Sequence, residues 1–208
     1  MKTKIIISLF VCLCAATTSY GQGTLQITFD GPPVQPPSSA AIVTNYNESG
    51  MLFRPLPGSG GFVHVGANPV SFRPDDGSAY LQSTLAPAET LMFSFTTGSV
   101  FDLLSVDLAE YSTVLSGPTT VEFVGYHPDG STVTTSFTTD GIIDGTGPLA
   151  DFQTFYFKRF TDLTRVEIPT SGWSLDNLVV GVVPEPTSGA LVLMGGLVLW
   201  QACRRRHV

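Results

Sequence analysis

Short apolar segments separated by turn residues recur along the middle of the chain. In one of them Leu104, Val106 and Leu108 share a face, opposite Ser105 and Asp107. This period-two alternation is typical of a strand with one buried face and one solvated face. The pattern predicts ten strands, at residues 25–29, 41–44, 62–65, 91–95, 103–108, 120–125, 132–137, 152–157, 164–168 and 174–182.

Gly and Pro between regular short strands favour an all-β fold, either a single antiparallel sandwich or a barrel. Residues 126–131 predict a hairpin, because Pro128 suits the start of a turn and Gly130 tolerates a positive φ. The Pro-rich residues 32–39 and the Gly-rich residues 55–61 are predicted to be loops. No amphipathic helix is predicted outside the C-terminal tail.

The N-terminus has the three parts of a secretory signal peptide. Lys2 and Lys4 precede an apolar run over residues 5–16, and Ser19 and Gly21 provide small residues before Gln22. We therefore expect a signal peptide at residues 1–21 and export by the Sec machinery. A retained transmembrane helix is disfavoured because the run is shorter than the roughly 20 residues of a span. A lipoprotein is disfavoured by the bulky Val11 before Cys12.

The C-terminal residues 183–208 combine a rigid tripeptide, an apolar run and a basic end. Pro184, Glu185 and Pro186 precede apolar residues 187–202, and Arg204, Arg205 and Arg206 follow. This order resembles the PEP-CTERM sorting signal of bacterial surface proteins. The resemblance implies a single transmembrane helix at about 187–202 that holds the chain transiently in the inner membrane, with the arginines on the cytoplasmic side. It also implies processing by an exosortase-type membrane protease; a permanent, unprocessed anchor is the alternative.

The body of the chain also resembles the sandwich domains that precede PEP-CTERM tails. The similar segments are residues 101–108, residues 125–131 and residues 173–180. The resemblance implies a jelly-roll-like antiparallel β-sandwich ectodomain at residues 22–182, similar to carbohydrate-binding modules, without implying an activity.

Charge and cysteine content narrow the ligands of this ectodomain. Residues 22–186 contain five basic residues and all seventeen acidic residues, Glu185 of the C-terminal signal included, a formal charge of −12. Nucleic acid is excluded as a partner, because Lys and Arg provide most of the affinity for phosphate. Neutral extracellular polysaccharides and divalent cations are still possible ligands of the ectodomain. Cys12, Cys14 and Cys203 all lie in the terminal signals, so the ectodomain contains no disulfide.

Three oxygen-bearing residues are a candidate calcium site. Asp30 follows the first predicted strand, and Asp176 and Asn177 lie in the last, and these strands often pair in a sandwich. Carboxylate and amide oxygens suit Ca²⁺. In sandwiches similar to carbohydrate-binding modules a structural calcium often lies between these strands. The alternative is that these side chains stabilise turns. Residues 75–78 are a second oxygen cluster, which we interpret as a solvated turn.

Catalytic patterns are weak, and we expect a non-catalytic binding or structural protein of the cell surface or matrix. Residues 105–110 are similar to the Glu-x-Asp-x-x-Glu strand of laminarinase-like glycosidases, but Ser105 replaces the first Glu, and Asp107 and Glu110 should face opposite sides. His64 and His127 have no partner at metal or triad spacing. A divergent secreted glycan-active hydrolase is the alternative.

Aromatic side chains divide between core and surface in this interpretation. Phe155, Phe157 and Trp173 are predicted to be core, and Tyr156 to face outward. An exposed Tyr126 or Tyr111 would be compatible with glycan contact.

Overall fold

A computed structural model describes residues 23–32, 40–58, 60–66, 72–83, 91–115, 117–143 and 151–182. The predicted signal peptide (1–21), the sorting motif Pro184, Glu185 and Pro186, the transmembrane helix and the basic tail lie outside the described residues. Within the described ranges, no helix is long and apolar enough to cross a membrane.

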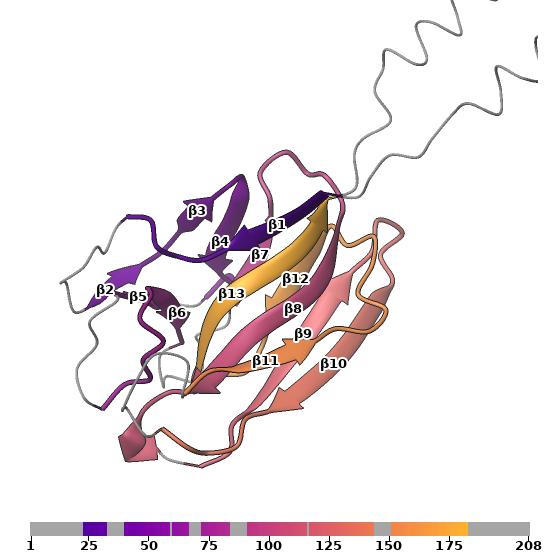
Figure 1. The fold of residues 1–208 in the computed structure, drawn as a ribbon. Coiled ribbons are helices and arrows are strands. Elements are labelled where there is room, and N and C mark those ends of the chain that lie inside the picture. Colours follow the sequence, from indigo (N-terminus) through magenta and orange to yellow (C-terminus); the bar gives the residue numbers. More distant parts are fainter. Residues whose placement is uncertain are drawn as a thin grey trace, which may run out of the picture. The chain divides into compact units, whose positions relative to one another are not determined.

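The described strands form two sheets (Figure 1). Sheet A has the order β11 (Gln153–Tyr156), β8 (Phe101–Glu110), β13 (Trp173–Val182), β6 (Tyr80–Gln82), β5 (Phe62–Val65), β2 (Ala40–Val43), with β1 (Gly23–Ile27) also paired to β13. Sheet B has the order β10 (Thr132–Thr138), β9 (Thr120–Tyr126), β12 (Arg165–Ile168), β7 (Leu91–Phe95), β4 (Met51–Pro55), β3 (Tyr46–Glu48). A 3₁₀ turn, η1 (Thr113–Leu115), follows β8. The fold is therefore all-β with antiparallel pairing, and all ten predicted strands are confirmed.

The alternating pattern of each strand places one face in a shared core between the sheets. Along β9, Val121 and Phe123 are fully buried, whereas Glu122 and Val124 are only partly covered. Trp173 is fully buried, and Phe155 and Phe157 pack against the same core, while Tyr156 is 71% exposed. These predictions for the aromatic residues are confirmed.

The prediction that Leu104 shares a face with Val106 and Leu108 was wrong, because β8 contains a bulge. Leu103 pairs with Val180 and Ser105 with Val179, so Leu104 is an extra residue in the ladder. Such a bulge turns the following side chains to the other face of the strand. Leu103 is consequently buried and Leu104 is 36% exposed, the reverse of the prediction from simple alternation.

Three strands were not predicted: β3, β4 and β6. The first two form a hairpin through the turn Ser49-Gly50, where both residues have positive φ. β6 has only three residues, and all three are buried, so it shows no alternation.

The first and last described residues lie at the same corner of the sandwich. β1 begins beside the end of β13, and the two strands are neighbours in sheet A (Figure 1). Because β13 ends at Val182, every described strand is complete before the predicted sorting motif at Pro184.

Candidate functional site

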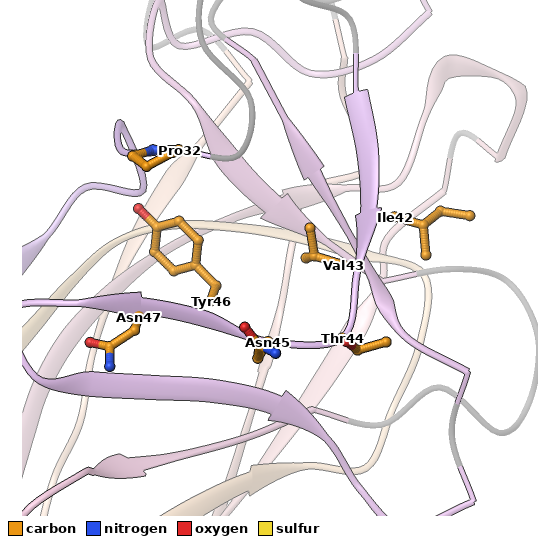
Figure 2. Close-up of a pocket in the computed structure, with 7 residues that line it drawn as sticks. All are labelled: Pro32, Ile42, Val43, Thr44, Asn45, Tyr46 and Asn47. Atoms are coloured by element: carbon orange, nitrogen blue, oxygen red, sulfur yellow. The ribbon is translucent and has the colours of Figure 1, made fainter.

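A surface hollow of about 450 Å³ lies where the chain passes from β2 in sheet A to β3 in sheet B. Ile42 and Val43 project from opposite sides of β2 (Figure 2). We call this feature the neutral hollow, because none of its described lining residues carries a formal charge. These residues are Pro32, Ile42, Val43, Thr44, Asn45, Tyr46 and Asn47. The volume is in the range of small-molecule pockets.

The rim of the neutral hollow is polar and solvated. Thr44, Asn45 and Asn47 are exposed, and each provides a side chain that can both donate and accept hydrogen bonds. Ile42 is 75% exposed and adds an apolar edge. Such a mixture of amides, a hydroxyl and aliphatic groups suits an uncharged ligand with both hydroxyl groups and C–H faces.

Tyr46 lines the neutral hollow, and hydrogen bonds of its hydroxyl group fix the side chain. It is only 3% exposed, and its hydroxyl donates to Glu48 Oε2 at 2.7 Å and accepts from the Gly31 amide at 3.3 Å. Burial and the adjacent Glu48 carboxylate raise the pKa of the Tyr46 hydroxyl, so it stays neutral. A side chain at Gly31 would meet this hydroxyl at 3.1 Å, which explains a glycine there.

Glu48 also holds the turn that carries Pro32 to the rim. Its carboxylate accepts hydrogen bonds from the backbone amides of Thr28 at 3.0 Å and Phe29 at 2.9 Å. Phe29 has a φ of 59°, a left-handed conformation that is strained for a bulky residue. The carbonyl of Phe29 bonds to His64 Nε2 at 2.7 Å, so the strained residue is fixed from both sides.

His64 is buried beneath the same turn. Its ring lies 5.0 Å from the Tyr46 ring between centroids. Burial lowers the pKa of His64, so the imidazole is neutral at physiological pH. The strand position predicted for this histidine is confirmed, and its role is to support the turn below the neutral hollow.

The second polar feature is a pair of buried carboxyl groups, Asp76 and Asp176, which we call the acid pair. Asp176 is fully buried in β13 and Asp76 is 7% exposed. The hydroxyl of Ser78 bonds to both, to Asp176 Oδ2 at 2.7 Å and to Asp76 Oδ1 at 2.8 Å. Burial, with a hydrogen bond and negative charge from Asp76, raises the pKa of Asp176 to about 10. The Asp176 carboxyl group therefore keeps its proton at neutral pH.

The burial of Asp76 corrects the interpretation of residues 75–78 as a solvated turn. The segment folds over the outer face of sheet A, so the Asp76 side chain meets Asp176 instead of water. Its Oδ2 atom is buried and has no hydrogen-bond partner among the described residues.

The residues predicted to bind calcium lie around this segment but are not all directed to one point. Asp30 accepts a hydrogen bond from the Ala79 amide at 3.0 Å, next to the Ser78 that contacts Asp176. Asn177 Oδ1 instead accepts from Gln26 of β1 at 2.7 Å. Within the described ranges, no group of three or more His, Cys, Asp or Glu side chains is arranged to hold a metal.

The donors of the acid pair nevertheless fit a hard cation. The buried Asp76 Oδ2 has no hydrogen-bond partner among the described residues, and the Ser78 hydroxyl joins the two carboxyl groups, so a divalent cation could replace the proton on Asp176. Asp76, Asp176 and Ser78 would hold it. Calcium at Asp30, Asp176 and Asn177 stays a prediction.

The carboxylates of the glycosidase-like segment lie on opposite faces of β8. Asp107 accepts a hydrogen bond from the exposed Thr154 at 2.6 Å, on the outer side of sheet A. Glu110 is fully buried and accepts from the Gly141 amide at 2.6 Å. His127 lies in the hairpin turn, where its amide bonds to Ser131 O at 2.9 Å.

Tyr126 lies on the outer face of sheet B with its ring under Arg165, whose guanidinium carbon is 3.7 Å from the ring centroid. Its hydroxyl donates to Glu167 at 2.8 Å, and this bond raises the pKa of Tyr126. One face of this ring is thus occupied by a cation–π contact within the protein. The more open aromatic surface is that of Tyr156.

The neutral hollow was not predicted. Its polar residues fall in the short connection between two strands, where Thr, Asn and Asn suggest only a turn. The one available signal is the density of uncharged amides there in a strongly acidic domain.

Comparison with known proteins gives structural likeness only. No protein-family model matches the chain, and no curated protein matches it. A family 11 carbohydrate-binding module from Clostridium thermocellum, in complex with a β-1,3-1,4-mixed-linked tetrasaccharide, is 12% identical with a TM-score of 0.32; the match covers 79% of this chain and 99% of that one.

Two larger proteins match over a smaller share of their length. A xylanase from Clostridium thermocellum, complexed with xylohexaose, is 10% identical with a TM-score of 0.30, covering 79% of this chain and 28% of that one. A tailspike of bacteriophage CBA120 is 15% identical with a TM-score of 0.31, and the match covers 66% of this chain and 20% of that one. These scores are too low to establish a shared family or ligand.

Proposed function

We propose that the chain is an exported cell-surface or matrix protein whose β-sandwich binds a neutral glycan without cleaving it. The observation that carries this proposal is the absence of formal charge from the described lining of the neutral hollow, on a segment, residues 22–186, of formal charge −12. Anionic ligands are repelled by such a domain, and cationic ligands would find no carboxylate in the lining. A saccharide offers the hydroxyl groups that the Asn45 and Asn47 amides can bind.

Sorting through the C-terminal tail is the second part of the proposal. The order of Pro184-Glu185-Pro186, apolar run and arginines supports it, as does the end of β13 at Val182. Cleavage near the motif would leave all described strands intact. The jelly-roll-like topology and processing by an exosortase-type protease belong to the same proposal.

Glycan binding is tested with the full-length chain solubilised in detergent. We expect it to bind a neutral β-1,3-1,4-glucan in preference to the anionic polysaccharide alginate. Asn45→Ala/Asn47→Ala should weaken binding by about 1–2 kcal/mol, or roughly five- to thirtyfold. Thr97→Ala, an exposed hydroxyl in the β7–β8 connection, is the matched control. Equal binding by the double variant, or preference for alginate, would contradict the proposal.

Sorting is tested by the mass of the C-terminal peptide of the protein from surface and membrane fractions of its native cells. A terminus near residues 184–186 in the surface fraction is expected. An intact Arg204-Arg205-Arg206 end in the membrane fraction alone would establish the permanent anchor instead.

A further inference from the structure

One edge of sheet B is β10, which pairs with β9 and with no other described strand. It is the longest described strand at a sheet edge, with seven residues, against five in β1, four each in β2 and β11 and three in β3. Natural edges are usually protected by charge, proline or a bulge. β10, with the sequence TVTTSFT and an unbroken register with β9, has none of these.

The hydrogen bonds at both ends of the β9–β10 ladder show which backbone groups face outward. His127 N–H donates to Ser131 O at 2.9 Å, and Thr139 N–H donates to Thr119 O at 3.0 Å, so both are hydrogen-bonded pairs. Such pairs alternate along an antiparallel ladder, which assigns the odd-numbered residues of β10 to bonds with β9. The backbone groups that face away from β9 therefore belong to Thr132, Thr134, Ser136 and Thr138.

The side chains of β10 are symmetric in chemical class about Thr135. The apolar residues Val133 and Phe137 lie two positions before and two positions after Thr135. All the remaining positions of β10 carry a hydroxyl side chain, Thr or Ser. Reversing the strand leaves this order of classes unchanged. A strand of this kind is self-complementary when it meets a second copy of itself in antiparallel orientation.

We propose that β10 pairs with β10 of a second copy of this chain, antiparallel, about a two-fold axis at Thr135. Thr132 then bonds to Thr138 and Thr134 to Ser136 of the partner copy, so that all outward backbone groups are satisfied. The same register places Val133 opposite Phe137 on the inner face, a β-branched–aromatic pair that is favourable between strands. The six-stranded sheets of the two copies become one continuous sheet.

Charged side chains lie close to the partner copy only beyond the two ends of β10. The two Glu122 side chains, on β9 beside Ser136, would be separated by three strand spacings, roughly 14 Å, which is beyond the Debye length at physiological salt. Asp129 and Asp140, just outside the two ends of β10, would approach each other between copies. Pairing should therefore strengthen as ionic strength rises.

Cysteine cross-linking of the full-length chain in its native cells tests the axis. Thr135→Cys places two thiols opposite each other at the axis, at a spacing that a disulfide can bridge after a small adjustment. We expect a cross-linked dimer on non-reducing electrophoresis after oxidation. Val133→Cys, on the same face two residues away, lies opposite Phe137 and should give no dimer above the unsubstituted chain. No dimer with Thr135→Cys, or equal dimer with both variants, would overturn the proposal.

A charge-swap series, introduced on top of Thr135→Cys, tests the register. Thr134→Lys/Ser136→Lys puts like charges opposite each other twice and should lower the dimer about tenfold. Thr134→Lys/Ser136→Glu puts opposite charges there and should restore the dimer to at least the parent level. Because positions 134 and 136 are exposed, both double variants should leave the melting temperature of the fold unchanged. Equal loss in both double variants would overturn this register.

Discussion

The neutral hollow and the acid pair are adjacent to the same turn, residues 29–32, but they use polar groups in opposite ways. Gly31 bonds to Tyr46 in the neutral hollow, and Asp30 bonds to Ala79, next to the Ser78 that joins the acid pair. The hollow exposes amides and no charge, whereas the acid pair buries two carboxyl groups. The difference shows that this acidic domain uses some of its carboxyl groups to fix loops on the sandwich.

This contrast predicts that stability and binding can be separated by substitution. Groups below the surface should control the free energy of unfolding, and the amides of the rim should control affinity. Glu48 is the exception, because it fixes both the strained turn and the floor of the hollow.

Glu48→Ala should reduce the free energy of unfolding by about 3 kcal/mol, because it leaves the Thr28 and Phe29 amides and the Tyr46 hydroxyl without their acceptor. Glycan binding should fall as well, since Tyr46 and Pro32 lose their fixed positions. Urea unfolding of the full-length chain measures the first effect. Glu122→Ala, on the outer face of sheet B, is the control and should stay within about 0.5 kcal/mol of the wild type.

Asp176→Asn should remove a pH dependence of stability. The pKa of Asp176 is raised from 3.8 to about 10 in the folded state, so its contribution is full below pH 3.8 and is lost as the pH rises toward 10. Between pH 5 and pH 8 only the folded state keeps this proton, so the wild type should lose up to about 1.4 kcal/mol of stability per pH unit, and the variant should lose little.

The control for this profile is Asp129→Asn. Hydrogen bonds from Ser131 lower the pKa of Asp129, so its contribution is lost only as the pH falls through the acid range. The variant should keep the slope of the wild type between pH 5 and pH 8. A wild-type stability that is constant from pH 5 to pH 8 would contradict the raised pKa of Asp176.

Calcium should oppose the loss of stability at high pH by taking the place of the Asp176 proton in the acid pair. At pH 8 and a calcium concentration tenfold above its dissociation constant, the free energy of unfolding should rise by about 1.4 kcal/mol. Thermal unfolding with calcium and with a chelator measures the difference. Asp176→Asn should abolish it, and a wild type that is insensitive to both additions would exclude calcium at these residues.

The sequence predicts most of the fold because the core is built from alternating strands. β5 and β7 begin and end where the pattern predicts, and β9, β10 and β13 agree within one residue. β6 was missed because a three-residue strand buried on both faces has no alternation to detect. The exposure of Leu104 could not be predicted either, since the bulge in β8 is visible only in its pairing with β13.

The candidate sites depend on tertiary contacts that local patterns do not contain. Residues Asp75-Asp76-Gly77-Ser78 have the composition of a turn, and only the packing of this segment on sheet A buries Asp76. Asp176 offers an indirect signal, because an acid between Leu175 and Leu178 in a core strand needs a buried partner. The neutral hollow requires β2 and β3 to belong to different sheets, which the sequence does not specify.

Asn45→Ala/Asn47→Ala should have the smallest effect on stability and the largest on affinity. Both side chains are exposed and neither takes part in the bonds that fix Tyr46, so the free energy of unfolding should change by less than about 0.5 kcal/mol. Measuring unfolding and glucan binding on the same preparation separates the two properties. If the double variant loses stability together with affinity, the amides support the turn rather than the ligand, and the division between the neutral hollow and the acid pair is wrong.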